Sequence, residues 1–161
     1  VEGAVTREAP IREAAIREAR PDDVPVILAL VRALAEYKRE PDAVLATEAD
    51  LSAALFGAAP KVFCHVAEHE GVVVGFALWF LNFSTWVGKH GIYLEDLFVS
   101  PAARGTGLGK ALLQNLVDIA TDRGYGRVEW SVLDWNTPAH EFYRAMGATP
   151  NDDWTTWRVT V

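Results

Sequence analysis

The chain has 161 residues, half of them hydrophobic, with a single cysteine and a formal net charge of −7. This length suits one domain with a sizeable core, and the negative charge argues against nucleic acid or an anionic membrane as a partner while permitting a cationic substrate. The longest apolar run, at 72–81, is too short to span a bilayer, no secretory signal is visible and one cysteine cannot form an internal disulfide, so we expect a cytoplasmic protein.

The start of the chain contains a short duplication. The tetrapeptide IREA occurs at 11–14 and again at 16–19. Because the second copy suits a first strand that leads into a turn, we predict that residues 1–14 form a flexible N-terminal extension. Residues 15–161 should then form a single domain.

Strand and helix signals alternate along the rest of the chain. Runs of β-branched and aromatic residues bounded by turn residues predict strands, and apolar residues at three- and four-residue spacing predict helices. The expected order is a strand at 16–20, a helix at 24–35, a helix capped by Thr47 and Asp50 at 48–56, strands at 61–68, 72–82 and 93–99, a helix at 108–120, a strand at 127–133, a helix at 137–146 and a last strand at 154–161. Asp22 and Asp23 should open the first helix, and residues 69–71 should join the strands at 61–68 and 72–82 in a hairpin. This order predicts an α/β fold with a mixed central sheet flanked by helices.

The centre of this pattern is the stretch YLEDLFVSPAARGTGLGK, from Tyr93 to Lys110. A strand runs into a turn, then into a loop with glycines at 105, 107 and 109, and then into a helix. Glycines let backbone N–H groups approach a ligand closely, and the N-terminus of a helix favours negative charge. The stretch therefore predicts a binding site for an anion.

Two nucleotide-binding motifs do not fit this loop. A dinucleotide fingerprint that starts at Gly105 needs a third glycine at 110, where the chain has Lys110. A P-loop needs glycine at 104 and Ser or Thr at 111, where the chain has Arg104 and Ala111. Both nucleotide interpretations are therefore excluded.

The spacing that fits is R-x-x-G-x-G, at Arg104, Gly107 and Gly109 directly after a strand. It resembles the acetyl-CoA pyrophosphate loop of the GNAT acyltransferase superfamily. The resemblance implies that superfamily's fold, a mixed and mostly antiparallel central sheet flanked by about four helices.

The histidines do not indicate a metal site. His65 and His69 are four residues apart, but they belong to a strand and a turn rather than to one face of a helix. His90 and His140 have no cysteine or paired acid at ligand spacing. We predict that the protein holds no metal.

Two adjacent acids interrupt the central strand. A carboxylate in so apolar a run is costly unless it has partners or faces a cavity, and alternation places Glu95 and Asp96 on opposite sides of the sheet. For Asp96 we favour a structural role, held by backbone N–H groups or a salt bridge. For Glu95 we favour a role as a base beside the acyl site over a structural one.

Tyr143 is the second candidate for chemistry. It lies in the segment NTPAHEFYRAMGA, where Asn136 can cap a helix and Pro138 is tolerated near its start. Its ring could pack while its hydroxyl bonds locally, or its hydroxyl could donate a proton to the departing CoA thiolate. The residue pattern alone leaves these two alternatives even.

From about Ile16 to Trp157 the chain resembles the spermidine/spermine acetyltransferase group of GNAT enzymes, and most of all its thialysine-acetylating branch. The segments that carry the resemblance are LALVRALAEY (28–37), GFALWF (75–80), STWVGK (84–89), IYLEDLFV (92–99), RGTGLGK (104–110), DWNTPA (134–139) and FYRAMGA (142–148). The resemblance implies acetyl transfer from acetyl-CoA to a primary amine, and a homodimer.

The same resemblance implies site residues, position by position. Glu95 matches a base that acts through a water molecule, and Tyr143 matches the acid that protonates the thiolate. The positions that match the acetyl-CoA site are Leu97, Phe98, Val99, Arg104, Gly105, Thr106, Gly107, Leu108, Gly109, Lys110, Asn136, Ala139 and Arg144. The residues expected around the acceptor amine are Tyr37, Lys38, Ser84, Trp86, Glu95, Asp152 and Asp153.

Two positions depart from the enzymes that are strict for polyamines. Those enzymes carry an acid at the positions of Lys38 and Ser84, and both acids would help to hold a polycation. The segments Ser84-Thr85-Trp86 and LDWN (133–136) instead resemble the thialysine-acetylating branch and its bacterial relatives. The sequence therefore predicts an N-acetyltransferase for a small primary amine, whether a diamine, a polyamine or a lysine-like amino acid.

Two alternatives of other classes remain. A regulatory module could bind acetyl-CoA without catalysis, although the presence of both Glu95 and Tyr143 argues against this. Acetylation of a protein N-terminus or lysine would need an open peptide groove, and no feature of the sequence indicates one.

Overall fold

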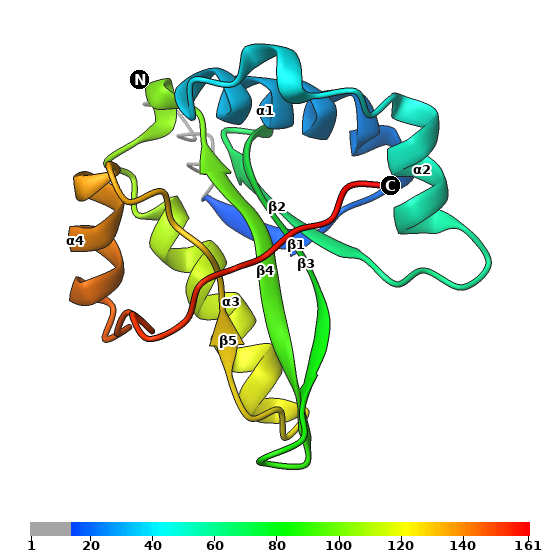
Figure 1. Cartoon of the computed structure of the whole chain (residues 1–161). Coiled ribbons are helices and arrows are strands. Elements are labelled where there is room, and N and C mark those ends of the chain that lie inside the picture. The colour runs from blue at the N-terminus through cyan, green and yellow to red at the C-terminus, as the bar shows by residue number, and fades with distance from the viewer. Residues whose placement is uncertain (1–13) are drawn as a thin grey trace, which may run out of the picture. The chain divides into compact units, whose positions relative to one another are not determined.

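The computed structural model describes residues 14–161, which fall into two compact units that meet in sequence at Trp130 and Ser131. The predicted extension therefore lies, apart from residue 14, outside the described residues. The elements of the first unit are β1 (Ala15–Glu18), α1 (Val24–Tyr37), α2 (Glu48–Phe56), β2 (Phe63–His69), β3 (Val72–Ser84), β4 (Lys89–Val99), α3 (Leu108–Asp122) and β5 (Val128–Glu129), as Figure 1 shows.

The five strands form one sheet in the order β1-β2-β3-β4-β5. The first three pairings are antiparallel and the last, between β4 and β5, is parallel. The predicted mixed and mostly antiparallel sheet is confirmed. The predicted hairpin between β2 and β3 is also confirmed, and its turn residues Glu70 and Gly71 have φ values of 53° and 81°, as a tight hairpin turn requires.

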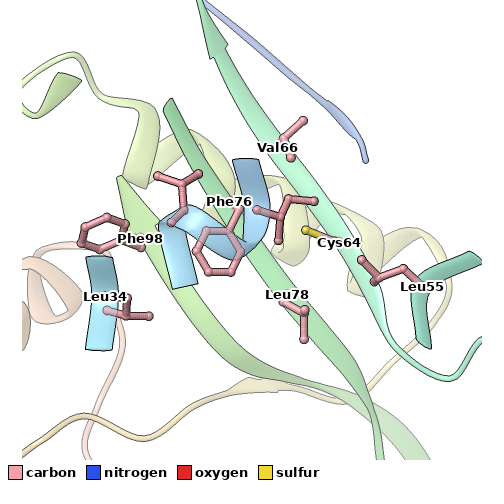
Figure 2. Packing of buried hydrophobic residues seen from close by; sticks show 9 residues of the cluster. Leu34, Leu55, Cys64, Val66, Phe76, Leu78 and Phe98 are labelled. Carbon is pink, nitrogen blue, oxygen red and sulfur yellow. The ribbon is translucent and has the colours of Figure 1, made fainter. Parts of the chain in front are cut away.

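Helices α1 and α2 cover one face of the sheet. Alternate residues of β2, β3 and β4 point toward these helices and join a buried cluster, which Figure 2 shows at close range. The members of this cluster are Ile27, Leu30, Leu34, Leu55, Cys64, Val66, Phe76, Leu78 and Phe98. Helix α2 begins at the predicted capping pair, in which Thr47 Oγ1 accepts a hydrogen bond from the Asp50 amide at 3.2 Å.

Helix α3 covers the other face, where it contacts β1 to β4. Its buried residues are spaced at helical period, and they include Leu112, Leu113 and Leu116. None of the helices among residues 14–161 is long and apolar enough to cross a membrane.

The second unit contains α4 (Thr137–Ala145), which brings the α-helices of the described chain to the expected four. The predicted strand at 154–161 is wrong. Residues 150–161 are all exposed and belong to no strand. Their alternation of apolar residues favours a strand, but a strand must pair within a sheet, and the five-stranded sheet described for residues 14–161 does not include them.

The predicted strand at 127–133 is shortened to the two residues of β5. Its pairing with β4 covers only the rows of Ile92 and Tyr93. An irregularity in β4 follows immediately after these rows, and such irregularities bend a strand and end its regular pairing.

Candidate active site

Strand β4 carries a β-bulge at Glu95. Leu94 pairs with Trp79 and Asp96 pairs with Leu78, so Glu95 is an extra residue between two consecutive rows of the ladder. The bulge shifts the alternation of side chains. Leu94 lies on the face covered by α3, and Asp96 lies on the face covered by α1, although they are two residues apart. Glu95 itself is exposed, on a strand whose neighbouring residues are mostly buried.

Asp96 forms an ion pair with the end of α1. Its Oδ1 lies 3.7 Å from Nζ of Lys38, and the two side chains are 22% and 40% exposed. Burial raises the pKa of Asp96, and the Lys38 ammonium opposes that rise. Of the two structural arrangements expected for Asp96, backbone N–H groups or a salt bridge, the salt bridge is therefore confirmed. Lys38, which we expected to face the acceptor amine, has its ammonium beside this carboxylate.

Arg104 connects the end of α1 to the start of the glycine loop. Its guanidinium carbon lies 5.3 Å from the ring centre of Tyr37 and 5.6 Å from that of Phe98, which are cation–π distances. Its Nε donates a hydrogen bond to the carbonyl oxygen of Val99 at 3.3 Å. Two residues predicted for different ligands, Tyr37 for the acceptor and Arg104 for the cofactor, thus lie in contact.

The glycine loop has the backbone conformation that an anion cradle requires. Gly105 and Gly107 both have φ of 80°, and a Cβ added at either position would meet no atom within 4 Å. Gly107 is the N-cap of α3, and the first N–H groups of a helix have no partner inside the helix. Thr106 Oγ1 donates a hydrogen bond to the carbonyl of Ala103, which fixes the loop. These features fit the pyrophosphate of acetyl-CoA.

The edge of β4 beside this loop is open. Pairing with β5 stops at Tyr93, so the backbone from Leu94 to Val99 has no strand partner on that side within the described chain. Leu97, Phe98 and Val99, which match positions of the acetyl-CoA site, lie on this edge. An extended ligand with peptide groups can bind to such an edge as an additional strand would.

Ser84 and Trp86 lie far from the bulge. Ser84 pairs with Lys89 at the far end of the β3–β4 hairpin, and Trp86, in the turn, is 88% exposed. Strands rise about 3.3 Å per residue, so six residues of β3 separate Ser84 from the row of Asp96 by roughly 20 Å. The structure therefore does not bring these two predicted acceptor residues to Glu95 of the same chain.

The remaining predicted site residues belong to the second unit. Tyr143 is half-buried on α4, with its ring centre 5.3 Å from that of Phe142. Asn136 occupies the predicted N-cap position, but its side chain makes no capping hydrogen bond. The others in this unit are Ala139 and Arg144 on α4 and the exposed acids Asp152 and Asp153.

Two other kinds of site, a nucleophilic cysteine and a metal centre, find no support in residues 14–161. Burial raises the pKa of Cys64 to about 12, so its thiol is not a nucleophile at neutral pH. Residues 14–161 contain no group of three or more His, Cys, Asp and Glu placed to hold a metal ion.

Sequence reasoning missed the bulge and the two contacts that join α1 to β4 and the loop. The adjacent acids Glu95 and Asp96 indicated an irregularity in the strand. The position of a bulge, however, depends on the pairing of β4 with β3. The contacts of Lys38 and Arg104 join residues far apart in sequence, and no local pattern encodes them.

Comparison with known proteins agrees with this geometry. Residues 27–148 match the acetyltransferase (GNAT) family. The chain is 40% identical over 141 residues to the thialysine N-epsilon-acetyltransferase of Bos taurus, covering 83% of this chain and 82% of that protein. It is 31% identical over 190 residues to an L-ornithine N5-acetyltransferase of Arabidopsis thaliana, covering 90% and 83%.

Among solved structures, an integron cassette protein from the mobile metagenome of V. cholerae superposes with a TM-score of 0.76 at 27% identity, covering 92% of this chain and 93% of that one. GNAT enzymes use acetyl-CoA as the acetyl donor, and the glycine loop fits that donor. The chain belongs to the acetyltransferase (GNAT) family and is an N-acetyltransferase.

Proposed function

We propose that the protein transfers an acetyl group from acetyl-CoA to a primary amine of a small molecule by direct attack. The amine nitrogen forms a bond to the thioester carbon, and the carbon–sulfur bond then breaks. Glu95 removes a proton from the incoming ammonium, directly or through one water molecule, and Tyr143 gives a proton to the departing thiolate. These steps convert an ammonium and a thioester into an amide and a thiol, and the remaining proton leaves to solvent.

The position of Glu95 carries this proposal. It is the bulge residue of β4, it is exposed, and it lies on the open edge of β4 that leads into the glycine loop. Bulges redirect side chains next to active sites in other proteins. An acid on this segment is therefore well placed to act on an amine that attacks an acetyl group held along β4.

Direct attack is favoured over an acetyl-cysteine intermediate. Cys64 is the sole cysteine of the chain, it is 6% exposed, and its burial keeps it protonated. A covalent mechanism would need an accessible thiolate.

We further propose that the acceptor is an amino acid with a terminal amine, or a short diamine, rather than spermine. Relatives at 40% and 31% identity are named for thialysine and for ornithine, both of which are amino acids with a terminal amine. The net charge of −7 suits a cation. Asp96 beside the bulge is already paired with Lys38, so one potential site for a further ammonium is neutralised within the chain.

A homodimer belongs to the same proposal. Ser84 and Trp86 are separated from Glu95 of their own chain by most of the hairpin, so we assign them to the acceptor site of a second copy. The exposed aromatic Trp86 at the tip of a long hairpin suits such a contact.

The replacement Glu95→Gln tests the proposed function. Glutamine keeps the size of the side chain and cannot accept the proton, so kcat should fall on the order of 10²- to 10⁴-fold. Because Glu95 is exposed, thermal stability and acetyl-CoA binding should remain as in the wild type. Steady-state kinetics with thialysine should be measured beside a melting curve. Unchanged kcat in Glu95→Gln would remove Glu95 from the mechanism.

A further inference from the structure

A pocket of about 360 Å³ lies at the edge of the sheet where β1 and β2 meet. Its lining residues come from β1, β2, β3, α2, the loop after α2 and the end of α3, and none comes from β4 or the glycine loop. The volume falls within the range of small-molecule sites, roughly 300–1,000 Å³. Leu55, Phe56 and Phe63 supply apolar walls. The proposed acetyl transfer makes no use of this pocket.

His65 lines the pocket with one of its two ring nitrogens hydrogen-bonded inside the protein. His65 is 8% exposed, and its Nδ1 accepts a hydrogen bond from Nε1 of Trp79 at 3.1 Å. An indole nitrogen can only donate, so Nδ1 carries no hydrogen and Nε2 carries one. Burial lowers the pKa of His65, which keeps this tautomer neutral. Its Nε2–H donates no hydrogen bond to any residue in the described part of the chain.

Two opposite charges flank this histidine. Glu18 of β1 and Arg123 at the end of α3 both line the pocket, and they shift the pKa of His65 in opposite directions. Neither side chain forms an ion pair with another residue among 14–161, and their charged atoms are more than 4.0 Å from each other. The pocket is therefore lined by one cationic side chain, one anionic side chain, a neutral hydrogen-bond donor and several apolar side chains.

We propose that this pocket binds an α-amino acid with an apolar side chain. The carboxylate of the ligand lies between Arg123 and Nε2–H of His65, and its ammonium faces Glu18. The apolar side chain packs among Leu55, Phe56 and Phe63. A ligand with one charge can pair with only one of Glu18 and Arg123, whereas a zwitterion can form a charge-assisted hydrogen bond with each. This site is separate from the acetyl-transfer site.

The test uses three probes with one apolar skeleton: L-leucine, 4-methylpentanoate, which lacks the ammonium, and isoamylamine, which lacks the carboxylate. Calorimetric titration of the full chain without acetyl-CoA should show L-leucine binding at least tenfold more tightly than either analogue. Arg123→Met and Glu18→Gln should each weaken L-leucine binding by about tenfold. Both residues are exposed, so both variants should fold.

Two control variants separate this site from general charge effects and from the acceptor site. Arg32→Met makes the same charge change on an exposed position of α1, and Glu95→Gln alters the proposed base; both should bind L-leucine as the wild type does. The proposal is overturned by no binding of L-leucine at about 10 mM. Equal binding of L-leucine and isoamylamine, or wild-type affinity in Arg123→Met, overturns it as well.

Discussion

The ammonium of Lys38 and the carboxylate of Asp96 set the charge on the α1 side of β4. Asp96 is the more buried partner, and its pKa is raised by that burial, so it depends on Lys38 for compensation. Lys38 is more exposed and its side chain is flexible, which lets the ammonium of a ligand compete with it. The pair is therefore a candidate determinant of preference among amines.

Replacing Lys38 with Met should favour acceptors that carry a second ammonium. The ratio of kcat/KM for putrescine to that for 4-aminobutanol, which ends in a neutral hydroxyl, should rise about fivefold, since a partly exposed pair contributes about 1 kcal/mol. Lys38→Arg keeps the positive charge and should leave the ratio unchanged. A ratio that does not move in Lys38→Met would show that Asp96 does not contact the acceptor.

Tyr143→Phe isolates the hydroxyl of the proposed acid. The ring and its contact with Phe142 are kept, so folding should survive. Loss of the proton donor should lower kcat on the order of 10²- to 10⁴-fold with little change in the KM for acetyl-CoA. Normal kcat in a variant of normal thermal stability would assign the hydroxyl a structural role.

The glycine loop and the N-terminus of α3 form the part of the proposed acetyl-CoA site that depends most on backbone conformation. Gly107→Val should weaken acetyl-CoA binding by tenfold or more, about 1.4 kcal/mol, because the branched side chain enters the open space above the loop. Calorimetric titration with CoA measures this directly.

Gly124→Val is the matched control for that experiment. Gly124 also has a positive φ, 72°, and equally open surroundings, but it follows the C-terminus of α3. The strain of a left-handed valine should therefore be similar in both variants, while CoA affinity should fall only in Gly107→Val. Equal affinities in the two variants would contradict the placement of the pyrophosphate.

Patterns among residues that are close in sequence predicted most of the helices, strands and turns of the first unit. The capping pair Thr47–Asp50, the turn at Glu70–Gly71 and the periodicity of α3 each depend on residues within a few positions of one another, and all three are confirmed. Asp23 was expected to open α1 and does stand at its N-cap, but its carboxylate accepts hydrogen bonds from Arg17 across a turn instead of capping the helix.

Features that depend on distant partners were not predictable in this way. The bulge at Glu95 exists only in relation to β3, and the early end of β5 depends on how β4 bends. The C-terminal residues have the composition of a strand but belong to none of the strands described for residues 14–161. Glu95 and the glycine loop were proposed as site residues from the sequence, whereas the ion pair of Asp96 and the cation–π contacts of Arg104 required the structure.

Strand β4 organises the first unit. It carries the bulge with Glu95, presents an open backbone edge after Tyr93, and leads into the loop that starts α3. The end of α1 contacts the same strand through the ion pair of Lys38 with Asp96. It contacts the glycine loop through the cation–π contact of Tyr37 with Arg104. The end of α1, strand β4 and the glycine loop are thus in mutual contact within the first unit.

All of these predictions depend on acetyl transfer from acetyl-CoA to the terminal amine of a small, amino-acid-like acceptor. The most direct measurement is the initial rate of CoA release with thialysine, ornithine, putrescine, spermine and a short lysine peptide, with mass spectrometry of each product. We predict stoichiometric CoA release and acetylation of the terminal amine, with kcat/KM for thialysine, ornithine or putrescine above that for spermine and for the peptide. No CoA release above background with any amine, or a preference for spermine or the peptide over the small acceptors, would contradict the account.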